Sequence, residues 1–213
     1  GICTSRYELG GDLCEVSCLD ERTTAIAIGD ASGDSVPAAM IMSSVRGAMR
    51  SLLLRPDADV RGTEWVMHEI NRVLYDITPA HQFMSMLYGV IDSDALSFTY
   101  TNAGHPLPLV IREGQAQALK SHGMLLGVVE NYQYTKSSVQ LAAGDLLVLY
   151  SDGVSEAMSR GRKMFRSEGI VDAFEGSHSG SAQDVLHSIW SKLESHLRGG
   201  EADDRTLLVI KVR

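Results

Sequence analysis

Acidic residues at predicted turns are the side chains in this sequence that could do chemistry. Asp30 and Asp152 each follow an apolar, strand-like run, whereas Asp12 and the pair Asp203-Asp204 each precede one. Taken singly, each is typical of a turn, because Asp and Gly favour turns. Taken together, carboxylates at strand ends can converge at one edge of a sheet, where a hard cation such as Mg²⁺ or Mn²⁺ relieves their mutual repulsion. The pattern therefore indicates a divalent metal site.

Other catalytic motifs are absent from the sequence. It has no Gly-rich loop of the kind that binds nucleotide phosphates or dinucleotides. It also has no Cys or Ser motif typical of a side-chain nucleophile, which agrees with a reaction that uses metal-activated water. The three cysteines lack the paired thiols or histidines that zinc requires, so we expect reduced thiols at Cys3, Cys14 and Cys18.

Composition and charge narrow the class of protein. The chain has 213 residues, 44% of them hydrophobic, which suffices for one core and predicts a single domain over 1–213. Its 19 Lys+Arg against 27 Asp+Glu give a net charge of −8, which argues against nucleic-acid binding because that needs clustered cations. No apolar run approaches the roughly 18 residues of a membrane span, so we expect no membrane insertion of this segment. The start at Gly1 predicts a piece of a longer regulatory protein.

The elements that must position these acids are short strands and three helices. Apolar residues spaced by three and four predict helices over Val36–Leu54, Thr63–Ile77 and Ser181–Leu197. Runs rich in Val, Leu, Tyr and Thr, several separated by turn residues, predict the strands Leu13–Leu19, Thr24–Gly29, Phe83–Ile91, Leu96–Thr101, Leu107–Arg112, Tyr132–Leu141, Leu146–Tyr150 and Thr206–Val212. Strands grouped with strands and helices with helices indicate an α+β fold with mostly antiparallel sheet.

The helices carry further expectations. The second helix is predicted to bury Val66, Ile70, Val73 and Ile77, and the last to bury Val185, Ile189, Leu193 and Leu197. Ser181 and Asp184 resemble a capping box. On the first helix, Arg46 and Arg50 are four apart, on a face that could meet another domain or subunit.

A series of short motifs runs from residue 10 to residue 210. It consists of Gly10-Gly11-Asp12, Gly29-Asp30-Ala31-Ser32-Gly33, Val36-Pro37-Ala38-Ala39, Asn102-Ala103-Gly104-His105-Pro106, Leu126-Gly127, Gly144-Asp145, Tyr150-Ser151-Asp152-Gly153 and Asp203-Asp204-Arg205. In this order they resemble the bacterial SpoIIE/RsbU-like branch of the PPM (protein phosphatase 2C-like) metal-dependent serine/threonine phosphatases. Each motif alone is moderately specific, whereas the ordered set is strongly specific and covers nearly the whole chain.

The resemblance implies an α-β-β-α sandwich of two mostly antiparallel sheets flanked by helices, with two Mn²⁺ or Mg²⁺ ions. Asp30 would bridge both ions, and the backbone carbonyl of Ala31 would join the second. Asp152 and Asp203 would hold the first ion, while Asp12 would act on the second directly or through water. A metal-bridging water would then attack the phosphate of phosphoserine or phosphothreonine, in preference to phosphotyrosine.

The resemblance also implies partners. The usual substrate of this branch is a phosphorylated regulator of the anti-sigma-factor antagonist (STAS) type in the cytoplasm. The catalytic domain usually follows a sensor or receiver domain, and a homodimer is one expected assembly.

Departures from the family pattern keep an alternative open. Asp204 stands where relatives have Asp or Asn, so it is a weaker candidate ligand than Asp203. Ser32 replaces a histidine of the eukaryotic branch, and Asp34-Ser35 replaces a frequent His-Gly or Lys-Gly. We expect Asp34 to cap the following helix, with an added metal contact as the alternative. We expect His105 to be a hydrogen-bonded loop residue, with a catalytic role as the alternative. The alternative function is a catalytically weak, phosphatase-like binding module or scaffold.

Overall fold

The computed structural model describes residues 1–79, 81–174, 180–198 and 203–213. It contains two five-stranded sheets, and every pair of neighbouring strands is antiparallel. Each sheet has its own helices, which confirms the predicted α+β class with two antiparallel sheets flanked by helices. The chain forms two compact units, one containing residues 7–105 and 120–141 and the other residues 1–6, 106–119 and 142–213. We call them the α1–α2 unit and the α4–α5 unit.

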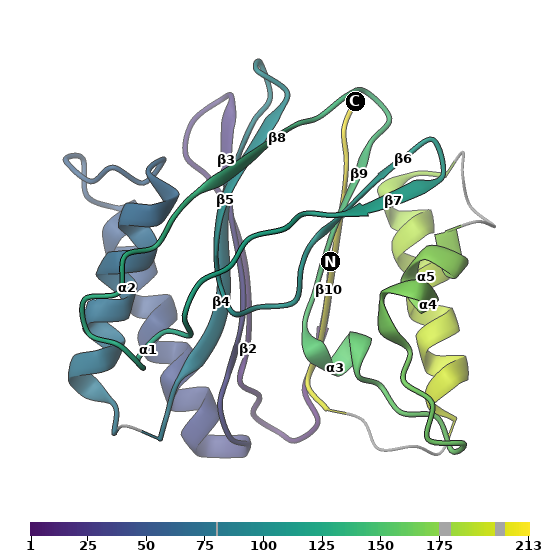
Figure 1. Ribbon diagram of the computed structural model, residues 1–213, viewed down its shortest axis with the longest axis horizontal. Helices are drawn as coiled ribbons and strands as arrows, with labels where there is room; N and C mark the ends of the chain where they lie inside the picture. The colour runs from purple at the N-terminus through teal and green to yellow at the C-terminus, as the bar shows by residue number, and fades with distance from the viewer. Residues whose placement is uncertain (80, 175–179, 199–202) are drawn as a thin grey trace. The chain divides into compact units, whose positions relative to one another are not determined.

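The α1–α2 unit is one sheet with two helices on one of its faces (Figure 1). Its strands lie in the order β2 (Asp12–Cys18), β3 (Thr23–Ala31), β4 (Met84–Asp92), β5 (Ser97–Ala103) and β8 (Ser137–Gln140). The helices α1 (Ser35–Leu53) and α2 (Thr63–Ile77) connect β3 to β4 and pack on the sheet. Alternate residues of the strands point toward them, because successive side chains of a strand face opposite sides.

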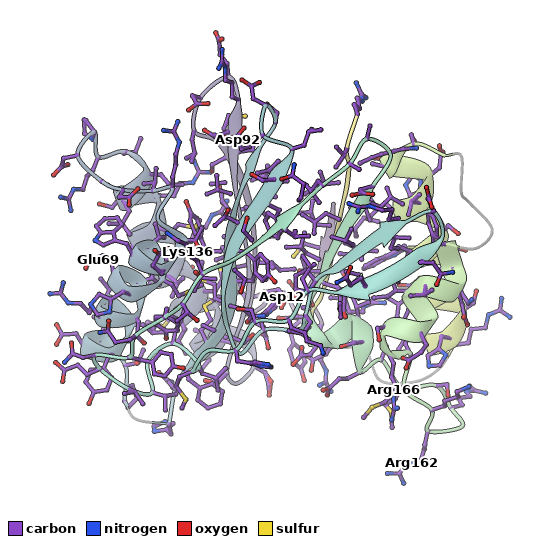
Figure 2. All side chains as sticks on the ribbon, turned by 45° about the horizontal axis from the view of Figure 1, so that its top comes forward. Asp12, Glu69, Asp92, Lys136, Arg162 and Arg166 are labelled. Atoms are coloured by element: carbon purple, nitrogen blue, oxygen red, sulfur yellow. The ribbon has the colours of Figure 1, made fainter. Side chains whose placement is uncertain are left out.

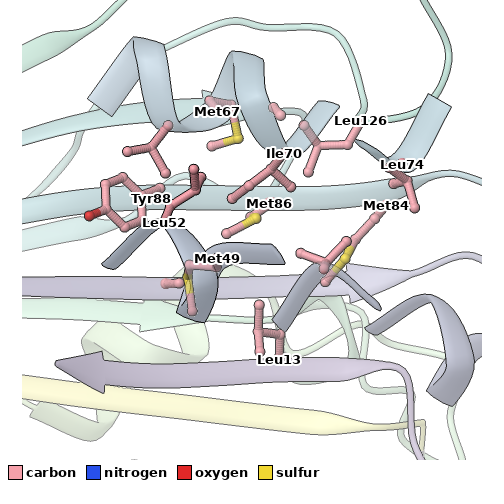
Figure 3. Close-up of a cluster of buried hydrophobic side chains, with 14 of the residues drawn as sticks. Leu13, Met49, Leu52, Met67, Ile70, Leu74, Met84, Met86, Tyr88 and Leu126 are labelled. Carbon is pink, nitrogen blue, oxygen red and sulfur yellow. The ribbon is translucent and has the colours of Figure 1, made fainter. Parts of the chain in front are cut away.

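The core of this unit lies between its sheet and its helices, as Figure 3 shows. Met84, Met86 and Tyr88 project from β4 at a spacing of two, and all three are fully buried. They meet apolar side chains of β2, of both helices and of the loop before β8, including Leu13, Met49, Leu52, Met67, Ile70, Leu74 and Leu126. The period of two on the strands and of three to four on the helices therefore converges on one cluster.

The predicted buried stripe of α2 is wrong at two positions. Val66 and Ile70 are fully buried, but Val73 is 42% and Ile77 54% exposed. The buried face is rotated toward Asn71, whose side-chain oxygen accepts a hydrogen bond from the Gly127 N–H at 2.9 Å. Its Nδ2 also donates to the carbonyls of residues 129 and 130. The buried face also carries Met67 and Leu74, and apolar periodicity alone does not place the polar Asn71 on it.

The α4–α5 unit has the strand order β1 (Ile2–Thr4), β10 (Arg205–Lys211), β9 (Leu146–Tyr150), β6 (Leu109–Arg112) and β7 (Gln115–Ala118). The short helix α3 (Asp152–Ser155) follows β9 directly, and α4 (Arg166–Phe174) packs with α5 (Ala182–Leu197). The predicted stripe of α5 is confirmed, since Val185, Ile189, Leu193 and Leu197 are buried. The predicted capping box is also confirmed.

Four of the described elements were not predicted, because their sequences are too short or lack the apolar periodicity of a helix or strand. The strand β7 is a fully exposed Gln-Ala-Gln-Ala, β1 has three residues, α3 has four, and α4 has nine with Gly169 in its interior. The predicted strand Tyr132–Leu141 shortens to β8, because the rings of Tyr132 and Tyr134 pack edge to face in the loop before it. Within the described parts of the chain, no helix is both long and apolar enough to cross a membrane.

An ion pair between the buried carboxylate of Asp145 and the half-exposed Arg112 stabilises the α4–α5 unit. Asp145 is 1% exposed, and its carboxylate accepts hydrogen bonds from Arg112 Nε and Nη2 at 2.9 and 2.6 Å and from the Ala142 N–H at 2.8 Å. The Arg112 guanidinium holds the pKa of Asp145 below its ordinary value of 3.8. The carboxylate thus contributes stability above that value, and the contribution is lost as the pH falls further.

We expect Asp145→Asn to lower the free energy of unfolding by about 2 kcal/mol at neutral pH, because it leaves a charge-assisted pair incomplete. Urea unfolding of both proteins from pH 7 to pH 3 measures this, and the difference should shrink below about 3.8. Asp57→Asn is the matched control, since Asp57 also pairs with an arginine, Arg55, but at the exposed surface. Equal losses from the two substitutions would contradict the role of burial.

Candidate metal centre

Two of the predicted ligands face each other across neighbouring strands. Asp12 opens β2 and lies directly opposite Asp30 of β3. Side chains at opposite positions share a face of the sheet, with their Cβ atoms about 5 Å apart. Leu13, the next residue, packs in the core beside the helices, so both carboxylates lie on the face turned away from α1 and α2. Asp12 is 7% exposed (labelled in Figure 2). Two carboxylates so placed repel each other, which fits a divalent cation.

Backbone hydrogen bonds fix the segment after Asp30, where the carbonyl of Ala31 is a candidate ligand. The Ala31 N–H donates to the carbonyl of Gly11 at 3.3 Å, and the Ser32 N–H donates to that of Phe83 at 2.9 Å. The Ser32 hydroxyl accepts in turn from the Phe83 N–H at 2.9 Å. A Cβ at Gly11 would lie 3.1 Å from the Ala31 oxygen. The Gly10-Gly11-Asp12 motif therefore permits a close approach of the two strands beside the predicted ligands.

A buried histidine, His105, contacts the residue that is paired with Asp30 on the neighbouring strand β4. Ser85 of β4 lies directly opposite Asp30, and its hydroxyl is 2.8 Å from His105 Nδ1. His105 is 4% exposed. Asn102 binds its backbone twice, accepting from the His105 N–H at 2.7 Å and donating to the His105 carbonyl at 2.9 Å. The prediction of a hydrogen-bonded loop histidine is confirmed. Its partner Ser85 was missed, because only strand register reveals that Ser85 is beside Asp30.

The α4–α5 unit places its own acids at the ends of two paired strands. Asp152 follows β9, and Asp203 and Asp204 precede β10. The strands are held together at this end because the Ser151 N–H donates to the Thr206 carbonyl at 3.0 Å. The Thr206 N–H donates back to the Ser151 hydroxyl at 2.9 Å. This exchange brings Asp152 and Asp203 to one end of the sheet, as the strand-end argument predicts.

The electrostatics of Asp152 also fit a cation. Burial raises the pKa of this carboxyl, and the charges of Glu156 and, more weakly, Asp203 raise it further, against a lowering hydrogen bond from the Gly153 N–H. Ionised, the carboxylate is therefore poorly compensated by the residues around it. A bound divalent ion would supply that compensation.

Asp204 has a structural partner. Its Oδ1 accepts from the Arg6 N–H at 2.7 Å, and its own N–H donates to Asp203 Oδ1 at 2.9 Å. The carbonyl oxygen of Asp204 packs on Gly153, where a Cβ would lie only 1.9 Å away. The sequence pattern missed this role of Gly153 and placed it among turn residues.

The structure corrects two predictions about α1, the helix cap by Asp34 and the outward face of Arg46 and Arg50. Asp34 holds the N-cap position, but its side chain makes no capping hydrogen bond within the described chain, so the predicted side-chain cap is wrong. Arg46 and Arg50 do not simply face outward, because both form ion pairs with Glu15 of β2, Arg46 Nε at 3.0 Å from Glu15 Oε2. The Glu15 side chain is 5% exposed. These pairs tie α1 to the strand that begins with Asp12.

The predicted ligands thus fall into two sets, Asp12, Asp30 and Ala31 in the α1–α2 unit and Asp152, Asp203 and Asp204 in the α4–α5 unit. Outside residues 80, 175–179 and 199–202, no three His, Cys, Asp or Glu side chains form a ready metal-binding group. None of Cys3, Cys14 and Cys18 forms a disulfide in the described chain, in agreement with the expected reduced state.

The chain is similar to known proteins over most of its length. The chain is 30% identical over 194 residues to the phosphoserine phosphatase RsbU of Bacillus subtilis, covering 90% of this chain and 56% of RsbU. The structure of the PP2C phosphatase domain and part of the regulatory domain of SpoIIE from Bacillus subtilis superimposes with a TM-score of 0.85 at 20% identity, over 99% of this chain and 61% of that one. RsbX in complex with magnesium matches with a TM-score of 0.73 at 13% identity, over 100% and 96%.

The fold is therefore that of a PP2C-type phosphatase domain. The family model of stage II sporulation protein E (SpoIIE) matches residues 20–213, and the chain belongs to this family. It spans about half the length of RsbU.

Proposed function

We propose that the protein is a metal-dependent protein serine/threonine phosphatase. The observation that carries the proposal is the cross-strand pair of Asp12 and Asp30 in a chain of the SpoIIE family. Two further acids, Asp152 and Asp203, at the paired ends of β9 and β10 support it. Relatives support it as well, since RsbU is a phosphoserine phosphatase.

We propose that two Mn²⁺ or Mg²⁺ ions are the cofactor, as RsbX binding magnesium suggests. Asp30 would serve both ions, with the Ala31 carbonyl and Asp12 on the second and Asp152 and Asp203 on the first. Asp204 is a weaker candidate metal ligand, because its Oδ1 already accepts a hydrogen bond from the Arg6 N–H. When bound, such ions supply a nucleophilic water and neutralise phosphoryl oxygens.

The chain's own residues limit the proton chemistry. Ser32, at the position of the eukaryotic histidine, accepts a hydrogen bond from the Phe83 N–H, so its side chain is held toward β4. His105 is buried and bound to Ser85. We propose that solvent water protonates the serine alkoxide that leaves.

The proposed substrate is a phosphorylated regulator of the anti-sigma-factor antagonist (STAS) type. RsbU-like phosphatases support a phosphoprotein partner. An upstream sensor or receiver domain and a homodimer belong to the same proposal. A regulator of sigma factors acts where RNA polymerase works, so the proposed location is the cytoplasm.

The alternative is a phosphatase-like module that binds the same partner without hydrolysis. The substitution of Asp34-Ser35 in a frequent family motif favours it. The four carboxylates Asp12, Asp30, Asp152 and Asp203 favour an enzyme, because a scaffold has no need of repelling acids at strand ends.

We expect phosphoserine and phosphothreonine peptides to be hydrolysed at least about tenfold faster than a phosphotyrosine peptide of the same sequence. Tyrosine holds its phosphate several ångströms further from the backbone than serine, so one depth of site cannot place both for attack. Phosphate release from the three peptides in Mn²⁺, with a chelator control, measures this. Turnover of none of them would favour the scaffold, and a tyrosine preference would refute the proposed substrate class.

A further inference from the structure

The α4–α5 unit contains a cationic cavity that the proposed reaction does not use. Its volume is about 660 Å³, which is in the range of ligand-binding pockets. Four of its lining residues are Lys or Arg and two are acidic, on a chain whose net charge is −8: Arg162, Lys163, Arg166, Lys192, Glu168 and Asp172. The lining of this cavity is therefore positively charged, although the chain as a whole is negatively charged.

Three of these cations have no counter-ion within the described chain. Lys192 Nζ is 3.5 Å from Asp172 Oδ2, so this lysine is already paired. No such ion pair engages Arg162, Lys163 or Arg166, and all three are exposed. Arg162 lies on the loop that precedes α4, and Arg166 is the first residue of α4 (both are labelled in Figure 2).

This loop is anchored at its base. His196 of α5 places Nε2 2.8 Å from the Lys163 carbonyl, and its ring packs edge to face on Phe165 with 5.3 Å between centroids. Phe165 is buried. Met158 and Met164 pair as an isolated antiparallel bridge across the loop. The cations are thus presented from a fixed base, which lowers the ordering cost of binding.

Two of the cations also hold an unusual backbone conformation. Arg162 has φ 57° and Arg166 has φ 56°, the left-handed region that costs a residue with a Cβ about 1 kcal/mol. Glycine would relieve this cost, yet both positions carry arginine. A long guanidinium at each position is consistent with a binding role that outweighs the backbone strain.

We propose that this cavity binds an acidic segment of the phosphoprotein substrate, a proposal that rests on the function proposed above. Its cations match carboxylates, while Met158 and Met164 offer apolar surface to the side chains between them. A simple phosphate has no use for the apolar lining and fills little of the volume. Capture of an acidic segment would raise the local concentration of substrate and select against basic phosphopeptides.

Two phosphoserine peptides test the proposal, identical except that one carries four glutamates and the other four glutamines beside the phosphoserine. In Mn²⁺ and low salt, the protein should show about a tenfold higher kcat/KM for the glutamate peptide, mainly through KM. The double substitution Arg162→Gln/Arg166→Gln should remove this ratio. Fluorescence anisotropy of the labelled, unphosphorylated glutamate peptide gives a second readout, and binding should weaken about tenfold in the double variant and with rising salt.

Arg160→Gln is the matched control, because Arg160 is exposed on the same loop but does not line the cavity. It should keep both the ratio and the anisotropy. Equal ratios in the wild type and the double variant, with unchanged peptide binding, would overturn the proposal. So would full competition by inorganic phosphate, or tighter binding to vesicles of anionic lipid than to the glutamate peptide. If no peptide is hydrolysed at all, the proposed phosphatase function fails, while the anisotropy still decides the binding site.

Discussion

Asp30→Asn is expected to lower kcat/KM for a phosphoserine peptide at least about a hundredfold, close to the rate that the wild type retains in excess chelator. Asparagine keeps the size of the side chain but removes the negative charge directly opposite Asp12. The cation that the pair is proposed to hold then loses a charged ligand. Steady-state turnover, together with Mn²⁺ titration by calorimetry, measures both consequences.

Asp34→Asn is the matched control for that substitution. Asp34 is four residues further on, exposed, and its side chain makes no capping hydrogen bond in the described chain. Since asparagine also suits an N-cap position, turnover should stay within about twofold of the wild type. Near-normal turnover and Mn²⁺ affinity in a folded Asp30→Asn protein would refute the ligand assignment. A large loss in Asp34→Asn would instead indicate that this departure from the family motif adds a metal contact.

Local patterns were enough to predict the fold class. The strands β3, β4 and β9 carry apolar runs, and the buried stripe of α5 repeats every three to four residues. The predictions that were wrong, on the faces of α1 and α2, depend on contacts between distant parts of the chain. Arg46 and Arg50 were predicted to face another domain or subunit, because their ion-pair partner Glu15 lies about thirty residues earlier in the sequence. Asn71 lies on the buried face of α2, where it forms hydrogen bonds with residues almost sixty positions away.

The candidate site shows the same division. Acids at strand ends were visible in the sequence, but whether two of them face each other depends on register, and a slip of one residue would send Asp30 to the other face. The observed pairing of Asp12 with Asp30 and of Asp30 with Ser85 follows from the ladder of β2, β3 and β4. Register across a sheet is set by the sum of many side-chain contacts, so no single motif contains it.

Gly153→Ala is expected to cost about a hundredfold in turnover without removing any carboxylate. The added Cβ would lie 1.9 Å from the carbonyl oxygen of Asp204 and 3.0 Å from its carbonyl carbon, so either α3 or the segment of Asp203 and Asp204 must move. The two hydrogen bonds between Ser151 and Thr206, one of them to the Ser151 hydroxyl, hold the adjoining strands in place, which confines the shift to the candidate ligands. A displacement near 1 Å can reduce a rate by about two orders of magnitude.

The measurement must separate this displacement from a loss of stability, which overpacking should lower by about 1–3 kcal/mol. We therefore expect Gly153→Ala to weaken Mn²⁺ binding at a temperature where circular dichroism shows the protein folded. Gly47→Ala is the same chemical change inside α1 with no atom within 4 Å of the new Cβ. It should keep turnover and raise the free energy of unfolding by up to about 1 kcal/mol, because alanine favours a helix. A Gly153→Ala protein with a lower Tm but unchanged Mn²⁺ affinity and kcat would show that the close packing of Gly153 on Asp204 serves stability alone, and that Asp203 is not held there as a ligand.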